Sequence, residues 1–169
     1  MMKAITVWQP WASLVAIGAK KYETRSWATS YRGPIAIHAA TKKPHLVAYP
    51  PVDVAIRSAE VLGFPADIRT VDALCSLPRG CVIAIAELVE CWKIVDRYYT
   101  VYPKVGDARC IEASGKTGNV EGDEILFGNW TPGRYAWQLE NVHQLVTPIE
   151  VKGHQRLWNW QPPEEVQYA

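Results

Sequence analysis

The sequence predicts an α+β fold, a small and mostly antiparallel β-barrel of five or six strands with helices beside it. Three observations support this prediction. Short β-prone runs alternate with turn signals rich in glycine and proline, which is typical of small barrels. Two or three segments have helical spacing of apolar residues. The strands are too few and too irregularly spaced for a doubly wound sheet, and no G-x-G-x-x-G motif, P-loop or internal repeat occurs.

The elements are expected in the order strand, helix, strand, two helices, three strands and a closing β-segment. They lie at residues 3–8, 11–19, 35–39, 52–62, 71–77, 81–92, 134–142, 146–151 and 157–160. The first helix follows Pro10, which suits a first turn because it lacks an N–H, and it stops at Gly18. The middle helices end at Gly63 and before Pro78.

The run at residues 81–92 is the longest β-like segment, and its first half is apolar on both faces, as in a central strand. Residues 93–128 have weak periodicity and several glycines, so we expect a long excursion, partly helical around residues 108–114. We treat this excursion and residues 45–76 as insertions in a single domain that spans residues 1–169.

Composition places the chain among globular proteins. Of its 169 residues, 49% are hydrophobic and 21% are charged, which excludes intrinsic disorder. The net charge of +1 argues against binding polyanions by overall charge. Residues 1–45, however, hold seven basic residues and one acidic residue, a local net of +6 that can produce a positive face.

The sequence gives no sign of a membrane or secretory segment. No apolar run approaches the ~20 residues of a membrane-spanning helix. Residues 1–7 contain no apolar stretch followed by a cleavage site, so the cytoplasm is the expected location. The four cysteines form no C-x-x-C pair and are expected to be buried free thiols, and we expect no metal and no cofactor.

The segment most informative about chemistry is Gly18-x-Lys20-x-x-Glu23-x-Arg25. After the glycine the chain is expected to be extended, which places Glu23 and Arg25 on one face because they are two residues apart. Arginine binds phosphates or base edges with two hydrogen bonds, and lysine supplies a point charge. Glutamate accepts protons or reads an amino group. By spacing alone, a surface loop with ordinary ion pairs remains the alternative.

This motif, with Gln9-Pro10-Trp11-Ala12 before it, resembles the signature of the ASCH domain, which is named for homology to activating signal cointegrator-1. Residues 133–142 and 151–160 also resemble that family. The resemblance implies a PUA-like β-barrel in which the first helix and the barrel bound a cleft that binds RNA or another nucleic acid. Lys20, Glu23 and Arg25 carry over as residues that line this cleft.

The resemblance also implies an alternative, because some relatives look like ribonucleases or like amidohydrolases acting on a modified cytidine. In such a hydrolase, Lys20 and Glu23 would be the catalytic pair that transfers a proton. The amidohydrolase-like branch typically has threonine where this chain has Glu23, with Thr24 next to it. A third possibility is a protein-interaction adaptor, a class that the near-zero net charge leaves open.

Five further residues are candidate ligand contacts: Trp8, Gln9, Trp27, His38 and Glu87. The tryptophans could stack on a base or cover a ligand, and the alternative is that they anchor the fold. The glutamine could read a base edge or cap a strand end. The histidine could be a general base, bind phosphate, or be a structural residue. The glutamate interrupts an apolar strand and could pair with Lys20 or Arg25, or face outward.

The C-terminal segment mixes basic and aromatic side chains in a pattern typical of nucleic-acid contacts. These residues are Lys152, Arg156, Trp158 and Trp160. Their likeness to the family is equally explained by closure of the barrel.

Overall fold

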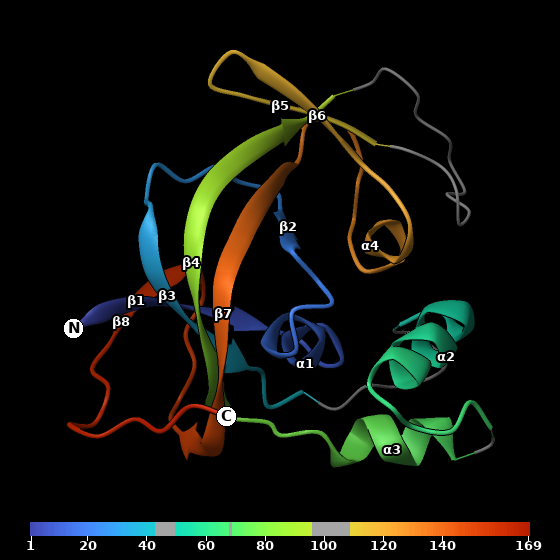
Figure 1. Ribbon diagram of the computed structural model, residues 1–169, viewed down its shortest axis with the longest axis vertical. Coiled ribbons are helices and arrows are strands. Elements are labelled where there is room, and N and C mark those ends of the chain that lie inside the picture. Colours follow the sequence, from blue (N-terminus) through green and yellow to red (C-terminus); the bar gives the residue numbers. More distant parts are fainter. Residues whose placement is uncertain (43–49, 68, 96–108) are drawn as a thin grey trace. The chain divides into compact units, whose positions relative to one another are not determined.

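The computed structural model of the chain describes residues 1–42, 50–67, 69–95 and 109–169 (Figure 1). This part forms eight strands and four helices. The strands are β1 (Met2–Val7), β2 (Tyr22–Arg25), β3 (Gly33–Ala39), β4 (Cys81–Ile94), β5 (Arg109–Ala113), β6 (Lys116–Val120), β7 (Tyr135–Glu150) and β8 (Leu157–Trp160). The helices are α1 (Trp11–Ala16), α2 (Val52–Val61), α3 (Thr70–Ser76) and α4 (Asp123–Leu126).

The strands belong to one mixed sheet, so the α+β class is confirmed. The strand order is β2-β7-β4-β3-β1-β8, and β5 pairs with both β4 and β6. β1 and β3 are parallel, whereas β1 and β8, β2 and β7, β4 and β5, and β5 and β6 are antiparallel. Among the described residues the order runs from β2 to β8 without closing, so a closed barrel is not confirmed.

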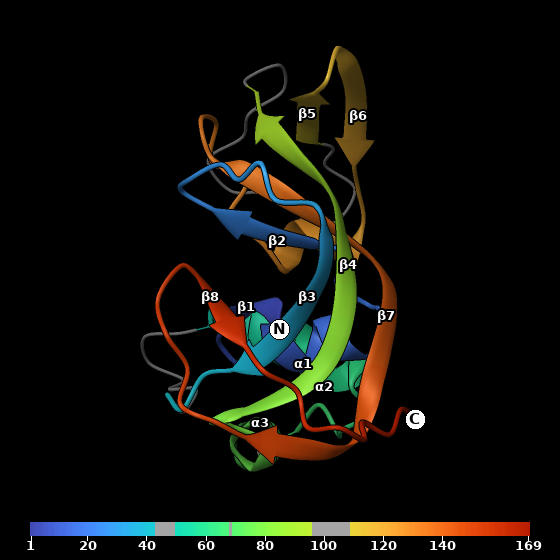
Figure 2. The same ribbon diagram turned by 90° about the vertical axis from the view of Figure 1, so that its left-hand side faces the viewer.

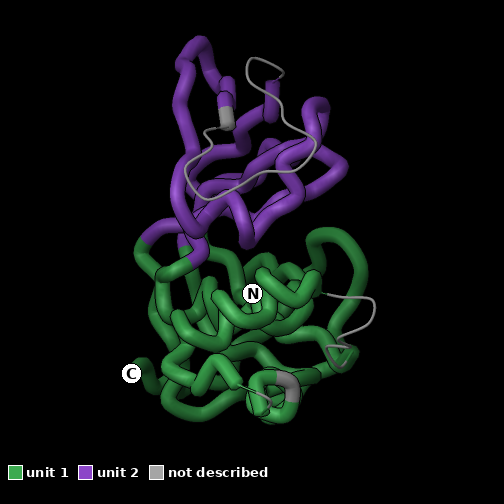
Figure 3. Tube along the Cα trace, turned by 90° about the vertical axis from the view of Figure 1, so that its right-hand side faces the viewer, with its two compact units in different colours: residues 1–19, 34–86, 141–169 green, residues 20–33, 87–140 purple. Residues whose placement is uncertain are grey.

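The chain divides into two compact units, which interleave along the sequence (Figure 3). Unit 1 consists of residues 1–19, 34–86 and 141–169, and unit 2 consists of residues 20–33 and 87–140. The long strands β4 and β7 each contribute residues to both units. Each unit has a hydrophobic core of its own.

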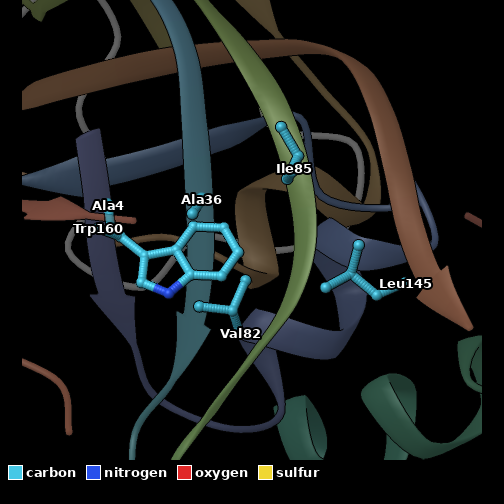
Figure 4. Packing of buried hydrophobic residues seen from close by; sticks show 6 residues of the cluster. All are labelled: Ala4, Ala36, Val82, Ile85, Leu145 and Trp160. Atoms are coloured by element: carbon cyan, nitrogen blue, oxygen red, sulfur yellow. The ribbon is translucent and has the colours of Figure 1, made fainter. Parts of the chain in front are cut away.

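The core of unit 1 lies along the strands that Figure 2 shows side by side, β8, β1, β3 and the first part of β4. Figure 4 shows six buried side chains of this core, Ala4, Ala36, Val82, Ile85, Leu145 and Trp160. The parallel register of β1 and β3 places Ile5 beside Ile37. Helices α2 and α3 pack on each other through a separate cluster, formed by Ala55, Ala59, Leu74 and Leu77.

The core of unit 2 gathers residues that are far apart in the sequence. Its buried members are Ile94, Ile111, Val120, Ile125, Trp130 and Ala136. Tyr22 of β2 packs against this cluster, and its ring meets that of Trp130 edge-on with 5.9 Å between the centroids. The segment at residues 109–126 is therefore part of this core.

Two expectations about the elements are wrong. The helical turn expected around residues 108–114 is instead the start of the β5–β6 hairpin (residue 108 lies outside the described residues). Ser114 and Gly115 both have positive φ, 51° and 75°, and form a two-residue turn that suits a twisted hairpin. The two strands expected at residues 134–142 and 146–151 are one continuous strand, β7. With β2, β5 and β6, the count rises to eight.

The expected helices agree with the structure to within a few residues: α1, α2 and α3 lie at 11–16, 52–61 and 70–76. The helices of the described part have 4 to 10 residues, too few to span a bilayer. The four cysteines are free thiols, as expected, although burial is complete only for Cys81.

Candidate functional site

The charged residues of the motif, Lys20, Glu23 and Arg25, lie on and just before β2, in unit 2. β2 is extended and antiparallel to β7, with Glu23 opposite Trp137 and Arg25 opposite Tyr135. The expected extended conformation is therefore confirmed. The side chains of Glu23 and Arg25 meet on one face, with 3.1 Å between Glu23 Oε1 and Arg25 Nε.

Lys20 is buried: its side chain is 1% exposed. Its ammonium group donates a hydrogen bond to the carbonyl oxygen of Tyr22. Its Nζ also lies 3.7 Å from Glu23 Oε2 and 3.9 Å from Glu124 Oε1. A buried ammonium is costly unless it is paired and hydrogen-bonded, and these three partners meet that requirement.

Glu124, on α4, is a residue of this site that sequence reasoning missed. One carboxylate oxygen, Oε2, accepts a hydrogen bond from Lys21 N at 2.7 Å, and the other, Oε1, accepts one from Tyr22 N at 3.1 Å. A single side chain thus satisfies two consecutive backbone N–H groups and also faces the ammonium of Lys20. The two contacts hold the start of β2 against α4.

These contacts cover the edge of β2 that faces away from β7. Leu139 N donates to Lys21 O at 2.8 Å on the β7 side, so the backbone groups of Tyr22 point the other way. There they bond to Glu124 and Lys20 rather than to another strand. An edge strand with its N–H and C=O groups occupied by side chains is protected from pairing with another chain.

The charged side chains form a row of alternating sign, Glu124–Lys20–Glu23–Arg25, which we call the motif cluster. Side-chain exposure along the row is 10%, 1%, 12% and 25%, so Arg25 is the member most open to solvent. Burial raises the pKa of Glu124, while Lys20 and the two backbone donors oppose that rise. The cluster is therefore anchored inside and presents a guanidinium group outside.

A second arginine lies close to the motif cluster. Arg134 contacts the carbonyl oxygen of Thr24 through Nη2 at 3.5 Å. Burial lowers its pKa, Glu23 opposes that effect and Arg25 adds to it. The Glu23 carboxylate thus interacts electrostatically with two guanidinium groups, those of Arg25 and Arg134. The two positive charges exceed the single negative charge of Glu23, and this local excess suits an anionic ligand.

Trp27 stands two residues beyond β2 and rests on a buried aromatic ring. Its ring meets that of Trp137 at 90° with 4.5 Å between the centroids. Trp137 is fully buried and its Nε1 donates to the carbonyl oxygen of Trp27 at 3.4 Å. Trp27 itself is partly exposed. The geometry fits both interpretations of this tryptophan, an anchor and a platform beside Arg25.

Three of the other candidate residues, Trp8, Gln9 and His38, belong to unit 1. Trp8 is 41% exposed, and Lys42 Nζ lies 4.1 Å from the centre of its ring, a cation–π contact. The amide of Gln9 is buried and donates to Pro78 O at 2.7 Å while accepting from Ser13 N at 3.0 Å. That glutamine therefore caps the start of α1, and both ends of its amide are occupied within the protein.

His38 is buried in unit 1, with 1% exposure. Its Nε2 lies 3.0 Å from the carbonyl oxygen of Val151, which can only accept, so Nε2 carries the proton of the neutral ring. Among the described residues Nδ1 has no hydrogen-bond partner. Burial lowers the pKa of His38, the Val151 contact opposes this, and His154 adds to it. The neutral imidazole acts here as a fixed structural donor.

The lowered pKa of His38 gives a testable pH dependence. As pH falls below 6.5, the unfolded chain binds a proton at His38 that the folded chain resists, so acidification removes stability. We expect His38→Gln, which keeps an N–H donor, to lose less folding stability than the wild type between about pH 7.5 and about pH 5.5. Urea unfolding at both pH values measures this. Equal losses of stability in the wild type and in His38→Gln would contradict the assignment of this pH dependence to His38. The control is His143→Gln, which replaces an exposed histidine.

Glu87, in the part of β4 that belongs to unit 2, has an exposed side chain between the buried residues Ala86 and Leu88. The strand alternation therefore turns this carboxylate outward. The acidic neighbours of Lys20 that the structure shows are Glu23 and Glu124. Among the described residues, no three His, Cys, Asp or Glu side chains group in a way that would hold a metal ion.

Comparisons with known proteins place this site in a family. The ASCH domain family model matches residues 5–153, which include the whole motif cluster. Activating signal cointegrator 1 of Homo sapiens is 34% identical over 89 residues, which cover 52% of this chain and 14% of that protein. The Mus musculus protein of the same name is 23% identical over 156 residues, which cover 91% of this chain and 21% of that protein. Because the family match extends over most of its length, the chain belongs to the ASCH domain family.

Proposed function

We propose that the chain binds nucleic acid through the motif cluster, with Arg25 as the residue that contacts the ligand. The observation that carries this proposal is the gradient of exposure along the cluster, from a buried, fully paired Lys20 to a partly open Arg25. Arginine is suited to phosphate oxygens and base edges because its planar fork donates two parallel hydrogen bonds. Trp27, partly exposed and supported by Trp137, offers an aromatic face two residues away.

In this proposal each member of the cluster has a distinct role. Glu124 and Lys20 hold the backbone of β2, because their contacts are with Lys21 and Tyr22. Glu23 orients the guanidinium of Arg25 through the 3.1 Å ion pair. Family membership supports the proposal, and with it a PUA-like arrangement of the strands. The named relatives extend far beyond the matched region, so this chain corresponds to at most 21% of their length.

A hydrolase that uses Lys20 and Glu23 is the alternative. The raised pKa of Glu124 beside an ammonium group is the kind of pairing that acid–base chemistry uses. Against it, the side chain of Lys20 is 1% exposed and already bonded to Tyr22 O, so a substrate atom would have to displace internal partners. The geometry favours a positioning role for the lysine and hence a binding module.

Arg25→Ala is expected to weaken binding of single-stranded RNA about 10- to 100-fold, because hydrogen bonds to charged groups contribute about 1.5–3 kcal/mol. Fluorescence anisotropy of a labelled oligonucleotide, titrated at several salt concentrations, measures the change. Arg25→Lys tests the role of the two parallel hydrogen bonds that a guanidinium group donates. Lysine keeps the positive charge, and with it the salt dependence of binding, but it loses the paired hydrogen bonds. Duplex RNA and both forms of DNA, titrated alongside, identify the preferred ligand.

The matched control is Arg32→Ala, which removes another partly exposed arginine of unit 2 that is also ion-paired, with Glu90. Its binding should equal that of the wild type. If wild-type protein binds none of the four nucleic acids, or if Arg25→Ala binds as tightly as Arg32→Ala, the proposal is wrong. The first of these outcomes would leave a protein-interaction adaptor as the better interpretation.

A further inference from the structure

The segment between β7 and β8, residues 151–156, is held by one buried and one half-buried side chain of unit 1, His38 and Thr6; we call it the β7–β8 loop. The carbonyl oxygen of Val151 faces His38 Nε2 at 3.0 Å, and that of His154 accepts from Thr6 Oγ1 at 2.9 Å. Gly153 lies directly on the imidazole of His38. Two of the loop's six carbonyl groups therefore point inward, and its course is fixed by side chains of β1 and β3.

The outer side of this loop is cationic. Lys152, His154 and Arg156 are exposed, Gln155 between them is neutral, and the loop contains no acidic residue. Glu150, the last residue of β7, is the nearest acid in the sequence. The loop thus presents two permanent positive charges and an imidazole within five consecutive residues. Side chains of β1 and β3 fix the course of its backbone.

An aromatic ring lies beside one of these exposed side chains, that of His154. The ring of Trp158, on β8, lies 5.2 Å from that of His154 and 5.7 Å from that of His38, centroid to centroid. Trp158 is partly buried and packs against the core of unit 1, and its Nε1 is buried without a hydrogen-bond partner among the described residues. Basic groups interleaved with aromatic rings on a fixed backbone are typical of surfaces that follow a sugar–phosphate chain.

We infer that the β7–β8 loop is a second nucleic-acid contact, in which Lys152 and Arg156 bind backbone phosphates and the rings of His154 and Trp158 lie beside the sugar and base. This inference rests on the proposal that nucleic acid is the ligand, and it adds a site in unit 1 to the motif cluster of unit 2. Phosphate contacts of this kind carry affinity and salt dependence rather than sequence preference.

The test is the salt dependence of single-stranded RNA binding by the full chain. The variant is Lys152→Gln/Arg156→Asn, in which asparagine suits the positive φ of 59° at residue 156. Loss of two phosphate contacts should reduce the slope of log K against log salt by about 1.4, because each contact on a single strand contributes about 0.7. The control, Arg57→Gln/Arg69→Gln, removes the same charge from α2 and the start of α3.

The outcomes separate this inference from the proposed function. A reduced slope in the loop variant, with the control unchanged, supports the loop as a contact. Wild-type slope in the loop variant, together with loss of binding in Arg25→Ala, overturns the inference and leaves the proposed function intact. Equal slopes in the loop and control variants, both below wild type, would mean that net charge alone acts and would also overturn the inference. Absence of binding by wild-type protein overturns both.

Discussion

Glu124→Ala is expected to lower the free energy of unfolding by about 3–5 kcal/mol, the usual cost of removing one partner from a buried charged pair. The substitution leaves the ammonium of Lys20 with one carboxylate fewer and removes the acceptor of two backbone N–H groups, Lys21 N and Tyr22 N. The short helix α4 would also lose its bond to β2. Urea unfolding followed by tryptophan fluorescence measures the change.

Two variants make this result interpretable. Glu121→Ala removes an exposed acid three residues earlier and should change stability by less than about 0.5 kcal/mol. Glu124→Gln keeps one acceptor oxygen and removes the charge, so its cost should fall between the other two. If Glu124→Ala and Glu121→Ala unfold at the same urea concentration, Glu124 does not hold the motif.

The raised pKa of Glu124 adds a signature that a purely steric role would not give. Between 4.5 and the raised folded pKa, the folded chain binds a proton at this carboxyl that the unfolded chain has lost. The contribution of Glu124 to the stability of the wild type is therefore largest below pH 4.5. It declines as pH rises from 4.5 through the raised pKa of Glu124 in the folded chain. Glu124→Gln should lack that decline, whereas Glu121→Ala should keep it.

The parts of the fold that sequence predicts well are those in which local signals agree. Helix α1 follows Pro10 and stops before Gly18, whose φ of 75° is the left-handed conformation that glycine adopts freely. Residues 81–86 are buried without exception, as a run apolar on both faces indicates. The sequence does not predict the β5–β6 hairpin, because its turn, Ser114-Gly115, is a weaker signal than Asn-Gly and β6 is mostly polar.

The contacts of the candidate site also differ in whether the local sequence predicts them. The contact between Glu23 and Arg25 follows from a spacing of two on an extended strand, which needs no knowledge of the rest of the chain. Glu124 is about a hundred residues away on a four-residue helix, so no periodicity marks it. The sequence interpretation offered Glu87 as a partner of Lys20 or Arg25, and the burial of Lys20, which requires acidic partners, is known only from the structure.

Gly153→Ala is expected to destabilise the protein by about 3 kcal/mol, at the upper end of the range for overpacking a filled site. A Cβ at this position would lie 2.6 Å from His38 Nδ1 and 2.9 Å from Thr6 Oγ1, and closer still to His38 Cε1. The φ of Gly153 is outside the left-handed region, so the cost is a collision with the ring rather than backbone strain. His38 cannot yield easily, because it is buried and bonded to Val151 O.

A double-mutant cycle tests this mechanism. In a His38→Ala background the ring is absent, so the added methyl group of Gly153→Ala should cost much less than in the wild type, and the coupling energy should exceed about 1 kcal/mol. Gly63→Ala is the converse control. That glycine has a φ of 80°, and nothing lies within 4 Å of an added Cβ, so the substitution loses stability through backbone strain alone. This loss should be the same in the wild type and in the His38→Ala background. Additive costs at residues 153 and 38 would show that the loop does not rest on the imidazole. Coupled costs, with a reduced salt slope for RNA binding in Gly153→Ala, would show that the buried histidine sets the position of the cations above it.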